Sequence, residues 1–412
     1  MAQDDYDVVI VGASLAGCTA ALLFSSMGAR VALLEKRSSM DAYKVLCTHS
    51  LHASAMPVLE RLDLVAALRA AGAAPNHTSW WAEWGWITPD HDGTVPFGLN
   101  LRRQTLDPLL RRRAAAAPGV DLVLGSAVTA VLERDGRVHG VRAAHGSKAI
   151  ELTAPLVVGA DGRNSAIAAA AGIRTRESPN LRFGFFAYFR DFPEDDGLSR
   201  AWFMGPDCAF SFINEDGIRV VVATPDSADH LAAFKADLAT SFRDYIRALP
   251  DAPHIGAAQQ ISKIIGITNF PLFQRNPSRP GLALIGDAAL ATDPVWGIGG
   301  SWAMLSAQWL VDAVAKSLDD QRELDSALGR YGARHTRELR GHQAQIRRYA
   351  RARGFNAAER LMFAAAARDQ ETASHLYRFG ARLITPRQLL TPRTVLRAGK
   401  VNLTHATRQL RC

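Results

Sequence analysis

The chain opens with a short apolar run that predicts a buried strand. Residues Tyr6 to Val11 are mostly β-branched, as expected of a parallel strand that is covered on both faces. The Ala- and Leu-rich stretch from Leu15 to Met27 predicts a helix, and Arg30 to Leu34 predicts a second strand after a turn at Gly28. This alternation of strand and helix indicates an α/β fold.

The same pattern continues in the first half of the chain and returns near residue 280. It predicts strands over 121–124, 127–133, 138–143, 150–160 and 282–285. The Asp135-Gly136 dipeptide lies between two of these strands and is a strong hairpin signal. A long helix is expected from Gly297 to about Val314.

The middle of the chain predicts an antiparallel sheet and one helix. The strands are expected over 182–192, 201–212, 217–224 and 259–270, and the helix over 226–249. The aromatic side chains of these strands either line an apolar pocket or fill the core between sheet and helix. They are Phe183, Phe185, Tyr188, Trp202, Phe203, Phe210 and Phe212.

The last part of the chain predicts helices. Residues 331–368 have helical periodicity, and residues 372–383 form a further amphipathic piece. We expect these helices to cover the substrate pocket or to form an oligomer contact.

Length and composition fit a globular protein of two or three structural units. The chain has 412 residues, of which 48% are hydrophobic, and no apolar run reaches the length of a transmembrane helix. The acidic N-terminus lacks the pattern of a signal peptide. The four cysteines form no close pair and no metal-ligand spacing, so we expect no metal and a cytoplasmic location.

The net charge of +8 comes from an Arg-rich composition, with many arginines late in the chain. No nucleic-acid-binding motif accompanies the charge, so we interpret it as solvated helix faces and expect no nucleic-acid partner.

A glycine-rich turn joins the first strand to the first helix. Gly12 permits the tight turn, and Gly17 permits close packing of the helix on the strand. The free N–H groups at the helix start, together with the helix dipole, favour a pyrophosphate. Ser14 replaces the middle glycine of the usual pattern and is small enough to be tolerated. Glu35 ends the second strand, where an acidic residue accepts hydrogen bonds from an adenosine ribose.

The glycine-rich turn is the first of three motifs along the chain. They are Gly12-Ala13-Ser14-Leu15-Ala16-Gly17, then Gly159-Ala160-Asp161-Gly162-Arg163, then Gly286-Asp287-Ala288-Ala289 with Asp293-Pro294 and Gly297-Ile298-Gly299-Gly300. In this order they resemble the motifs of FAD-dependent monooxygenases of the para-hydroxybenzoate hydroxylase type, and flavin-dependent halogenases and geranylgeranyl reductases share part of the pattern. The resemblance spans roughly residues 5–328.

The resemblance implies a domain organisation. A discontinuous Rossmann-like FAD-binding domain would comprise residues 1–75, 100–175 and 271–330. An inserted antiparallel-sheet substrate domain would comprise 76–99 and 176–270, and a C-terminal helical region 331–412.

The resemblance also implies the residues that bind non-covalent FAD. By this resemblance, Asp287 would accept a hydrogen bond from a ribityl hydroxyl and Arg103 would contact phosphate or ribose. The helix starting near Gly297 would point its dipole at the flavin ring. The complete expected set is Gly12, Ala13, Ser14, Ala16, Gly17, Glu35, Lys36, Arg37, Lys44, Arg103, Val128, Asp161, Gly162, Asp287, Pro294, Gly297, Ile298, Gly299 and Gly300.

Two residues between the second strand and the next helix are candidates for chemistry. Lys44 matches the position of a basic residue that lies near pyrophosphate and nicotinamide in the family. His49, like its neighbour His52, could act as acid or base, because imidazole titrates near neutral pH. The alternative is a structural hydrogen-bonding role. Covalent flavin attachment through His49 or Cys47 has no support in the sequence.

The activity implied by the resemblance is monooxygenation. NAD(P)H would reduce FAD, and a flavin C4a-hydroperoxide formed with O₂ would hydroxylate or epoxidise an apolar, aromatic or polyketide-like small molecule. The alternatives are a double-bond reductase of the geranylgeranyl reductase type, a halogenase, or a flavin-binding redox sensor without turnover. Trp84-Gly85-Trp86-Ile87-Thr88-Pro89 is similar to a halogenase motif but lies at the wrong place in the chain. We expect a monomer or homodimer.

Overall fold

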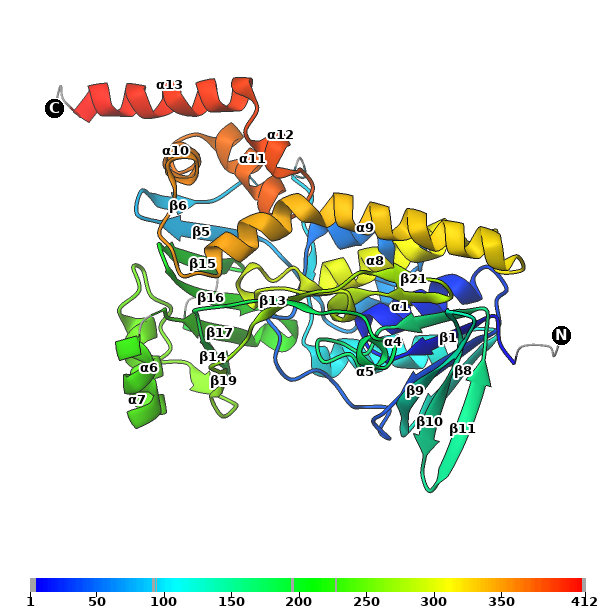
Figure 1. The fold of residues 1–412 in the computed structure, drawn as a ribbon. Helices are drawn as coiled ribbons and strands as arrows, with labels where there is room; N and C mark the ends of the chain where they lie inside the picture. Colours follow the sequence, from blue (N-terminus) through cyan, green and yellow to red (C-terminus); the bar gives the residue numbers. More distant parts are fainter. Residues whose placement is uncertain (1–4, 91–92, 94, 194–195, 227, 410–412) are drawn as a thin grey trace.

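The computed structural model describes residues 5–90, 93, 95–193, 196–226 and 228–409 (Figure 1). Its first layer is a six-stranded sheet in the order β21-β22-β12-β1-β2-β8. All neighbours are parallel except β21 and β22. The strands are β1 (Val8–Val11), β2 (Val31–Glu35), β8 (Val120–Leu124), β12 (Leu156–Gly159), β21 (Ser278–Arg279) and β22 (Leu282–Leu284). The side chains of β1, β2, β12 and β22 are all buried, as continuous apolar runs predict. The side chains of the edge strands β8 and β21 are mostly half-buried.

Helices cover one face of this sheet, and a small antiparallel sheet covers the other. The apolar faces of α1 (Leu15–Ser25), α4 (Arg103–Ala115), α8 (Gly299–Val314) and α9 (Gln321–Tyr349) share one core with the strands. On the other face lie α5 (Ala166–Ala170) and the meander of β9 (Ser126–Arg134), β10 (Arg137–His145) and β11 (Lys148–Thr153). The predicted α/β fold class is confirmed.

The second layer is an eight-stranded sheet, which is mainly antiparallel. Its order is β18-β14-β17-β16-β15-β5-β6, with β19 also paired to β14. The strands are β5 (Thr78–Ala82), β6 (Gly85–Ile87), β14 (Gly184–Arg190), β15 (Ser199–Met204), β16 (Asp207–Ile213), β17 (Arg219–Thr224), β18 (Gln259–Gln260) and β19 (Ile265–Ile267). The segment after residue 76 therefore joins this sheet through the parallel pairing of β5 with β15.

Both faces of the eight-stranded sheet are covered. One face packs on α6 (Ala228–Ala236) and α7 (Leu238–Arg247), and the other on α10 (Ala357–Ala366) and α11 (Gln370–Gly380). The aromatic side chains predicted either to line a pocket or to fill the core can now be assigned. All of them except Tyr188 are at most 7% exposed and fill these two cores. The core interpretation was the right one for those six side chains.

The remaining elements are short, apart from the last helix. They are α2 (Met56–Arg61), α3 (Val65–Ala70), α12 (Pro386–Leu389), α13 (Pro392–Gln409), and the two three-stranded sheets formed by β3 (Ser50–Leu51), β7 (Leu99–Asn100) and β4 (Ala74–Pro75), and by β13 (Arg176–Ser178), β20 (Leu272–Gln274) and β23 (Leu290–Ala291). Figure 1 shows α9 running across the molecule and α13 at its edge. Within the described part of the chain, no helix is both long enough and apolar enough to cross a membrane.

Several predicted elements are broken in the structure. The expected strand 201–212 is the β15–β16 hairpin, because Gly205 adopts a positive φ of 91° before Pro206. The expected helix 226–249 is split at Asp237, whose side chain caps the start of α7. The expected helix 331–368 is interrupted between α9 and α10. The expected strand 259–270 is reduced to β18 and β19.

Candidate FAD site

The turn between β1 and α1 accepts only glycine at two positions. Gly12 has a φ of 107°, and a Cβ there would lie 2.5 Å from the carbonyl oxygen of Ala160. A Cβ on Gly17 would lie 1.8 Å from the carbonyl oxygen of Gly12. Helix α1 thus lies directly against the strand end, and both glycines have the steric role that the sequence predicted.

Three helices, α1, α4 and α8, start in this region without a side-chain cap, and at α4 the N–H of Arg103 already donates to His49. Neither Ser14 before α1 nor Ile298 before α8 makes a capping hydrogen bond, and neither first turn contains an acidic residue. By contrast, α5, α7, α9, α10 and α11 all carry side-chain caps. The free N–H groups at α1 and α8 are therefore suited to anionic or electron-rich groups of a bound cofactor. This donor set fits FAD.

Glu35 is buried at the end of β2 and holds the glycine turn. One carboxylate oxygen accepts from the Ala13 N–H at 2.9 Å, and the other accepts from the Arg37 N–H at 3.0 Å. A carboxylate has further lone pairs for a ribose, so the expected ribose contact stays a prediction. The side chains of Lys36 and Arg37 are exposed beside it.

Three charged residues on one face of α4 hold the same turn through hydrogen bonds. Arg103 makes a two-point ion pair with Asp107, at 2.7 and 2.9 Å, and its Nη2 also donates to the Ser14 hydroxyl at 2.6 Å. Arg111 donates to the carbonyl oxygen of Ala13 at 3.1 Å. The hydroxyl of Ser14 is thus occupied by Arg103. Arg111 was missed in the sequence, although the three charges recur every four residues on one helix face.

Lys44 and Asp287 form an ion pair across the site. Their Nζ and Oδ2 atoms are 2.9 Å apart. Burial works to raise the pKa of Asp287, but Lys44, Arg163 and Arg103 outweigh burial, so the pKa is lowered and the carboxylate stays ionised. Both residues were expected to contact the cofactor separately, and the structure brings them together.

The Gly297–Gly300 segment packs against the loop that contains Thr48 and His52. Gly297 has a φ of 62°, and a Cβ there would lie 3.3 Å from Nε2 of His52. His52 is held by two contacts: its N–H donates to the Ser301 hydroxyl, and its ring bonds the carbonyl oxygen of Trp296. Burial lowers the pKa of His52 to about 4, so the ring is neutral and has a structural role here.

His49 links this loop to the eight-stranded sheet. The backbone N–H of Arg103 donates to Nδ1 of His49 at 3.0 Å. Burial and the charge of Arg103 lower the pKa of His49 to about 3. A neutral ring that accepts at Nδ1 carries its proton on Nε2, and this atom lies 2.7 Å from the Tyr188 hydroxyl. His49 therefore donates to Tyr188, whose own proton is directed elsewhere.

Three other predicted residues lie in the turn after β12 and in β9. The carboxylate of Asp161 accepts from the Ser165 hydroxyl at 2.6 Å and from the Ile167 N–H at 3.1 Å. It therefore closes the start of α5, whose N-cap is Ser165. Gly162 has a positive φ of 84° in the same turn. Val128 is half-buried in β9, and its contact with adenine stays a prediction.

A buried ion pair joins Arg182 to Asp293, and no sequence pattern indicated it. Their side chains are 2% and 0% exposed, and the nitrogen–oxygen distance is 2.7 Å. Arg182 also donates to the carbonyl oxygen of Tyr349 at 2.8 Å, and Asp293 accepts from the Val295 N–H at 2.9 Å. The pair therefore joins the sheet, the loop before α8 and the end of α9.

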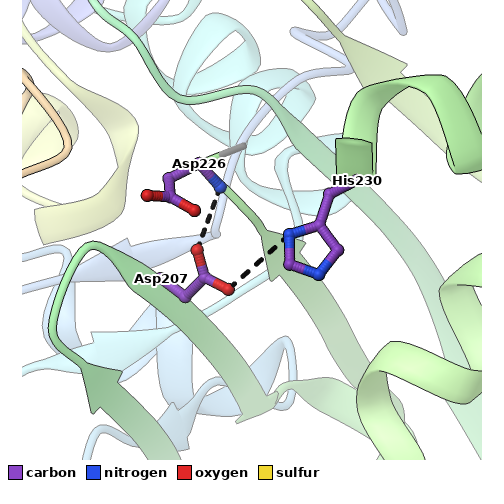
Figure 2. Close-up of side chains that lie close together, drawn as sticks. All are labelled: Asp207, Asp226 and His230. Atoms are coloured by element: carbon purple, nitrogen blue, oxygen red, sulfur yellow. Dashed lines mark hydrogen bonds and ion pairs between the residues drawn. The ribbon is translucent and has the colours of Figure 1, made fainter. Parts of the chain in front are cut away.

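A second group of titratable side chains lies away from this site, where β16, the end of β17 and α6 meet (Figure 2). Ligand-type atoms of Asp207, Asp226 and His230 lie within 4.8 Å of one another. The N–H of Asp226 donates to Asp207 at 3.0 Å. Burial and the neighbouring Asp226 raise the pKa of Asp207 to about 7.

This raised pKa predicts a pH-dependent difference in stability. The folded protein holds a proton on Asp207 that the unfolded chain releases near pH 4, so stability from this group is lost as pH rises from about 4 to 7. Asp207→Asn keeps the acceptor for Asp226. It should be more stable than wild type at pH 8, by about 1 kcal/mol or less after solvent screening, and equal to it near pH 4. Melting curves across this range test the prediction, and a constant difference at every pH would contradict it.

The fold and the paired helix starts define the class of a dinucleotide-binding flavoprotein. Residues 5–233 match the family model described as FAD binding domain. This match covers more than half of the chain, and the protein belongs to that family. It is an FAD-dependent oxidoreductase.

The similar proteins carry different activities. A digeranylgeranylglycerophospholipid reductase of Picrophilus torridus is 22% identical over 79% of this chain and 82% of its own length. The 6-methylpretetramide 4-monooxygenase of Streptomyces rimosus is 33% identical over 40% of this chain and 41% of its own length. The solved structure of the flavin-dependent brominase Bmp2 superposes with a TM-score of 0.76 at 15% identity, over 98% of this chain and 99% of that one. The fold is thus shared by monooxygenases, reductases and halogenases.

Proposed function

We propose that the protein is an FAD-dependent monooxygenase that uses NAD(P)H and O₂ to oxygenate an apolar, aromatic small molecule. The reaction would consume one NAD(P)H, one proton and one O₂, insert one oxygen atom into the substrate, and release NAD(P)⁺ and water. Bound FAD would supply the electron transfer and oxygen activation. The observation that carries the proposal is the His49–Tyr188 pair at the junction of the cofactor loop and the sheet.

The chain's own residues would bind the cofactor and orient the substrate. The starts of α1 and α8 would hold the pyrophosphate and the flavin ring, with Asp287 on the ribityl chain. Tyr188 receives a hydrogen bond from His49, so its hydroxyl proton is available to a substrate oxygen. Such a donor suits a phenol or a carbonyl. The covering of the sheet by α10 and α11 would help to exclude water.

A halogenase is less well supported by these residues. A halogenase would need a free lysine beside the flavin, and Lys44 is paired with Asp287 at 2.9 Å. The Trp84–Trp86 stretch forms a hairpin with structural contacts, because Trp86 packs on Trp202 and donates to Asp251 at 2.7 Å. Neither residue provides the chemistry of a halide-dependent route.

A double-bond reductase is the second candidate. The reductase match covers about 80% of this chain, whereas the monooxygenase match covers 40%. Both reactions need the same FAD site, so the residues that bind the substrate must decide between the two reactions.

Product mass separates the three reactions. We expect turnover with NAD(P)H, O₂ and a panel of aromatic and isoprenoid compounds to add the mass of one oxygen, and added chloride or bromide to leave the product unchanged. A product heavier by two hydrogens would move the assignment to the reductase. A halogen isotope pattern would establish a halogenase. If none of the compounds in the panel is turned over although dithionite reduces the bound FAD normally, a redox sensor would be favoured.

Tyr188→Phe tests the role of the hydroxyl. Loss of one neutral hydrogen bond costs about 0.5–1.5 kcal/mol, so we expect KM for the substrate to rise about two- to tenfold with FAD binding unchanged. Tyr245→Phe is the matched control, because its hydroxyl bonds the carbonyl oxygen of Cys208 within the other core. Equal effects of the two changes would show that Tyr188 is only structural.

A further inference from the structure

Exposed large apolar side chains gather at the C-terminal end of the chain. Of the seven such residues among those described, four lie between positions 390 and 403. Leu396 is 74% exposed and Leu403 is 70% exposed. They are seven residues apart on α13 and so lie on the same face of that helix.

The opposite face of α13 is fixed to the body of the protein. Ala398 is fully buried, and the side-chain amide of Asn402 donates to the carbonyl oxygen of Leu361 on α10 at 3.1 Å. Arg397 pairs with Asp369 at 2.8 Å. These contacts hold the helix in one rotation about its axis, and the two leucines point away from the protein. Figure 1 shows α13 lying along the outside of α10 to α12.

Each exposed leucine in this segment follows a cation by three residues. Arg387 precedes Leu390, Arg393 precedes Leu396, and Lys400 precedes Leu403. All three cations are exposed, and within the described part of the chain their side chains make no ion pair or hydrogen bond. Positions three apart are neighbours on a helix surface, so Arg393 and Lys400 lie beside Leu396 and Leu403 on α13. We call this surface, together with Arg387 and Leu390 just before the helix, the basic–leucine face.

The charge of the whole chain is concentrated in the same region. Residues 321–412 contain 19 Lys and Arg against 6 Asp and Glu, a net charge of +13. The total is +8, so the first 320 residues carry a net charge of −5. The basic–leucine face therefore belongs to the strongly basic C-terminal part of the chain.

We propose that the basic–leucine face is a docking surface for an anionic lipid bilayer. Leucines that project from a helix flanked by unpaired Lys and Arg are the features of a helix that lies in the bilayer interface. The cations would meet anionic headgroups, and the leucines would enter the acyl boundary. Docking would bring the protein to the bilayer, where an apolar substrate concentrates. This purpose rests on the proposed function, whereas the binding of lipid itself does not.

The same features disfavour a second copy of the chain as the occupant. Two exposed leucines provide far less area than the roughly 1,000 Å² of a stable interface. Two copies would also bring unpaired cations of like sign together. An acidic protein could meet the cations but would not require the leucines.

Vesicle sedimentation with the full-length holoprotein tests the proposal. We expect binding to phosphatidylglycerol vesicles but not to phosphatidylcholine vesicles, and release at about 1 M salt, where the Debye length is about 3 Å. The Leu396→Ser/Leu403→Ser variant should lose at least about tenfold in partitioning. Leu181→Ser removes a side chain that is 56% exposed outside this region and should bind as wild type does.

A charge series supplies the second test. The Arg387→Ser/Arg393→Ser/Lys400→Ser variant should lose binding. The matched control Arg113→Ser/Arg134→Ser/Arg174→Ser removes three exposed cations from elsewhere and should retain most of it. FAD content and melting temperature verify that each variant is folded.

Three outcomes would overturn the proposal. The first is that wild type does not bind phosphatidylglycerol vesicles. The second is vesicle binding that is indifferent to the leucines; if poly-glutamate binds equally well, the face would be assigned to an acidic protein. The third is a dimer in light scattering that the leucine variant dissociates, with no vesicle binding, which would assign the face to a second copy. Turnover measured without lipid separates failure of this proposal from failure of the proposed function.

Discussion

Asp293→Ala is expected to lower the free energy of unfolding by about 3–5 kcal/mol, because it leaves the buried guanidinium of Arg182 without its counter-charge. Arg182 would keep only the carbonyl oxygens of Tyr349 and Pro206 and its stacking on the Tyr349 ring, 4.3 Å from the centroid. For a chain of this length the loss corresponds to a fall in Tm of roughly 4–6 °C. Thermal melts at a fixed scan rate measure it.

The double variant Arg182→Met/Asp293→Leu is the control for this prediction. It removes both charges and leaves apolar side chains in the same place, so it should be markedly more stable than Asp293→Ala. If Asp293→Ala and the double variant lose equal stability, the effect comes from packing alone. In that case the ion pair would not hold the sheet, the α8 loop and α9 together.

The parts of the site that follow from local sequence were predicted well. Gly12 and Gly17 act within one strand, turn and helix, where spacing alone fixes what each position must do. The buried strands were equally clear, because a run such as Val8–Val11 has no polar position to offer solvent. Local signals were also misjudged: Gly205-Pro206 is a turn signal in a run that we expected to be one strand.

Contacts between distant segments could not be predicted in this way. Arg182 and Asp293 are 111 residues apart, and His49 and Tyr188 are 139 apart. No periodicity connects such positions, so only the fold shows that they meet. Position alone also did not show that Lys44 and Asp287 pair with each other. The expected contact of each residue with the cofactor stays a prediction.

Asp287 and Asp161 should differ sharply when each is replaced by Ala. Asp287 lies between the start of α8 and Lys44, and its ionised carboxylate is free to accept a further hydrogen bond from FAD. A hydrogen bond to a charged group is worth about 1.5–3 kcal/mol, so Asp287→Ala should weaken FAD binding by about tenfold to 100-fold. Titration of apoprotein with FAD measures this loss.

Asp161→Ala should behave in the opposite way. Its carboxylate is already used by Ser165 and Ile167 at the start of α5, so its removal should cost about 1 kcal/mol of stability and change FAD affinity less than threefold. Asp287→Asn is the matched control, because an amide oxygen can still accept while the charge is lost, and it should fall between wild type and Asp287→Ala. Equal losses of FAD affinity for the two alanine variants would show that the Asp161 carboxylate contacts the cofactor as closely as Asp287 does. The capping bonds to α5 would then have to be exchanged for bonds to FAD when the cofactor binds.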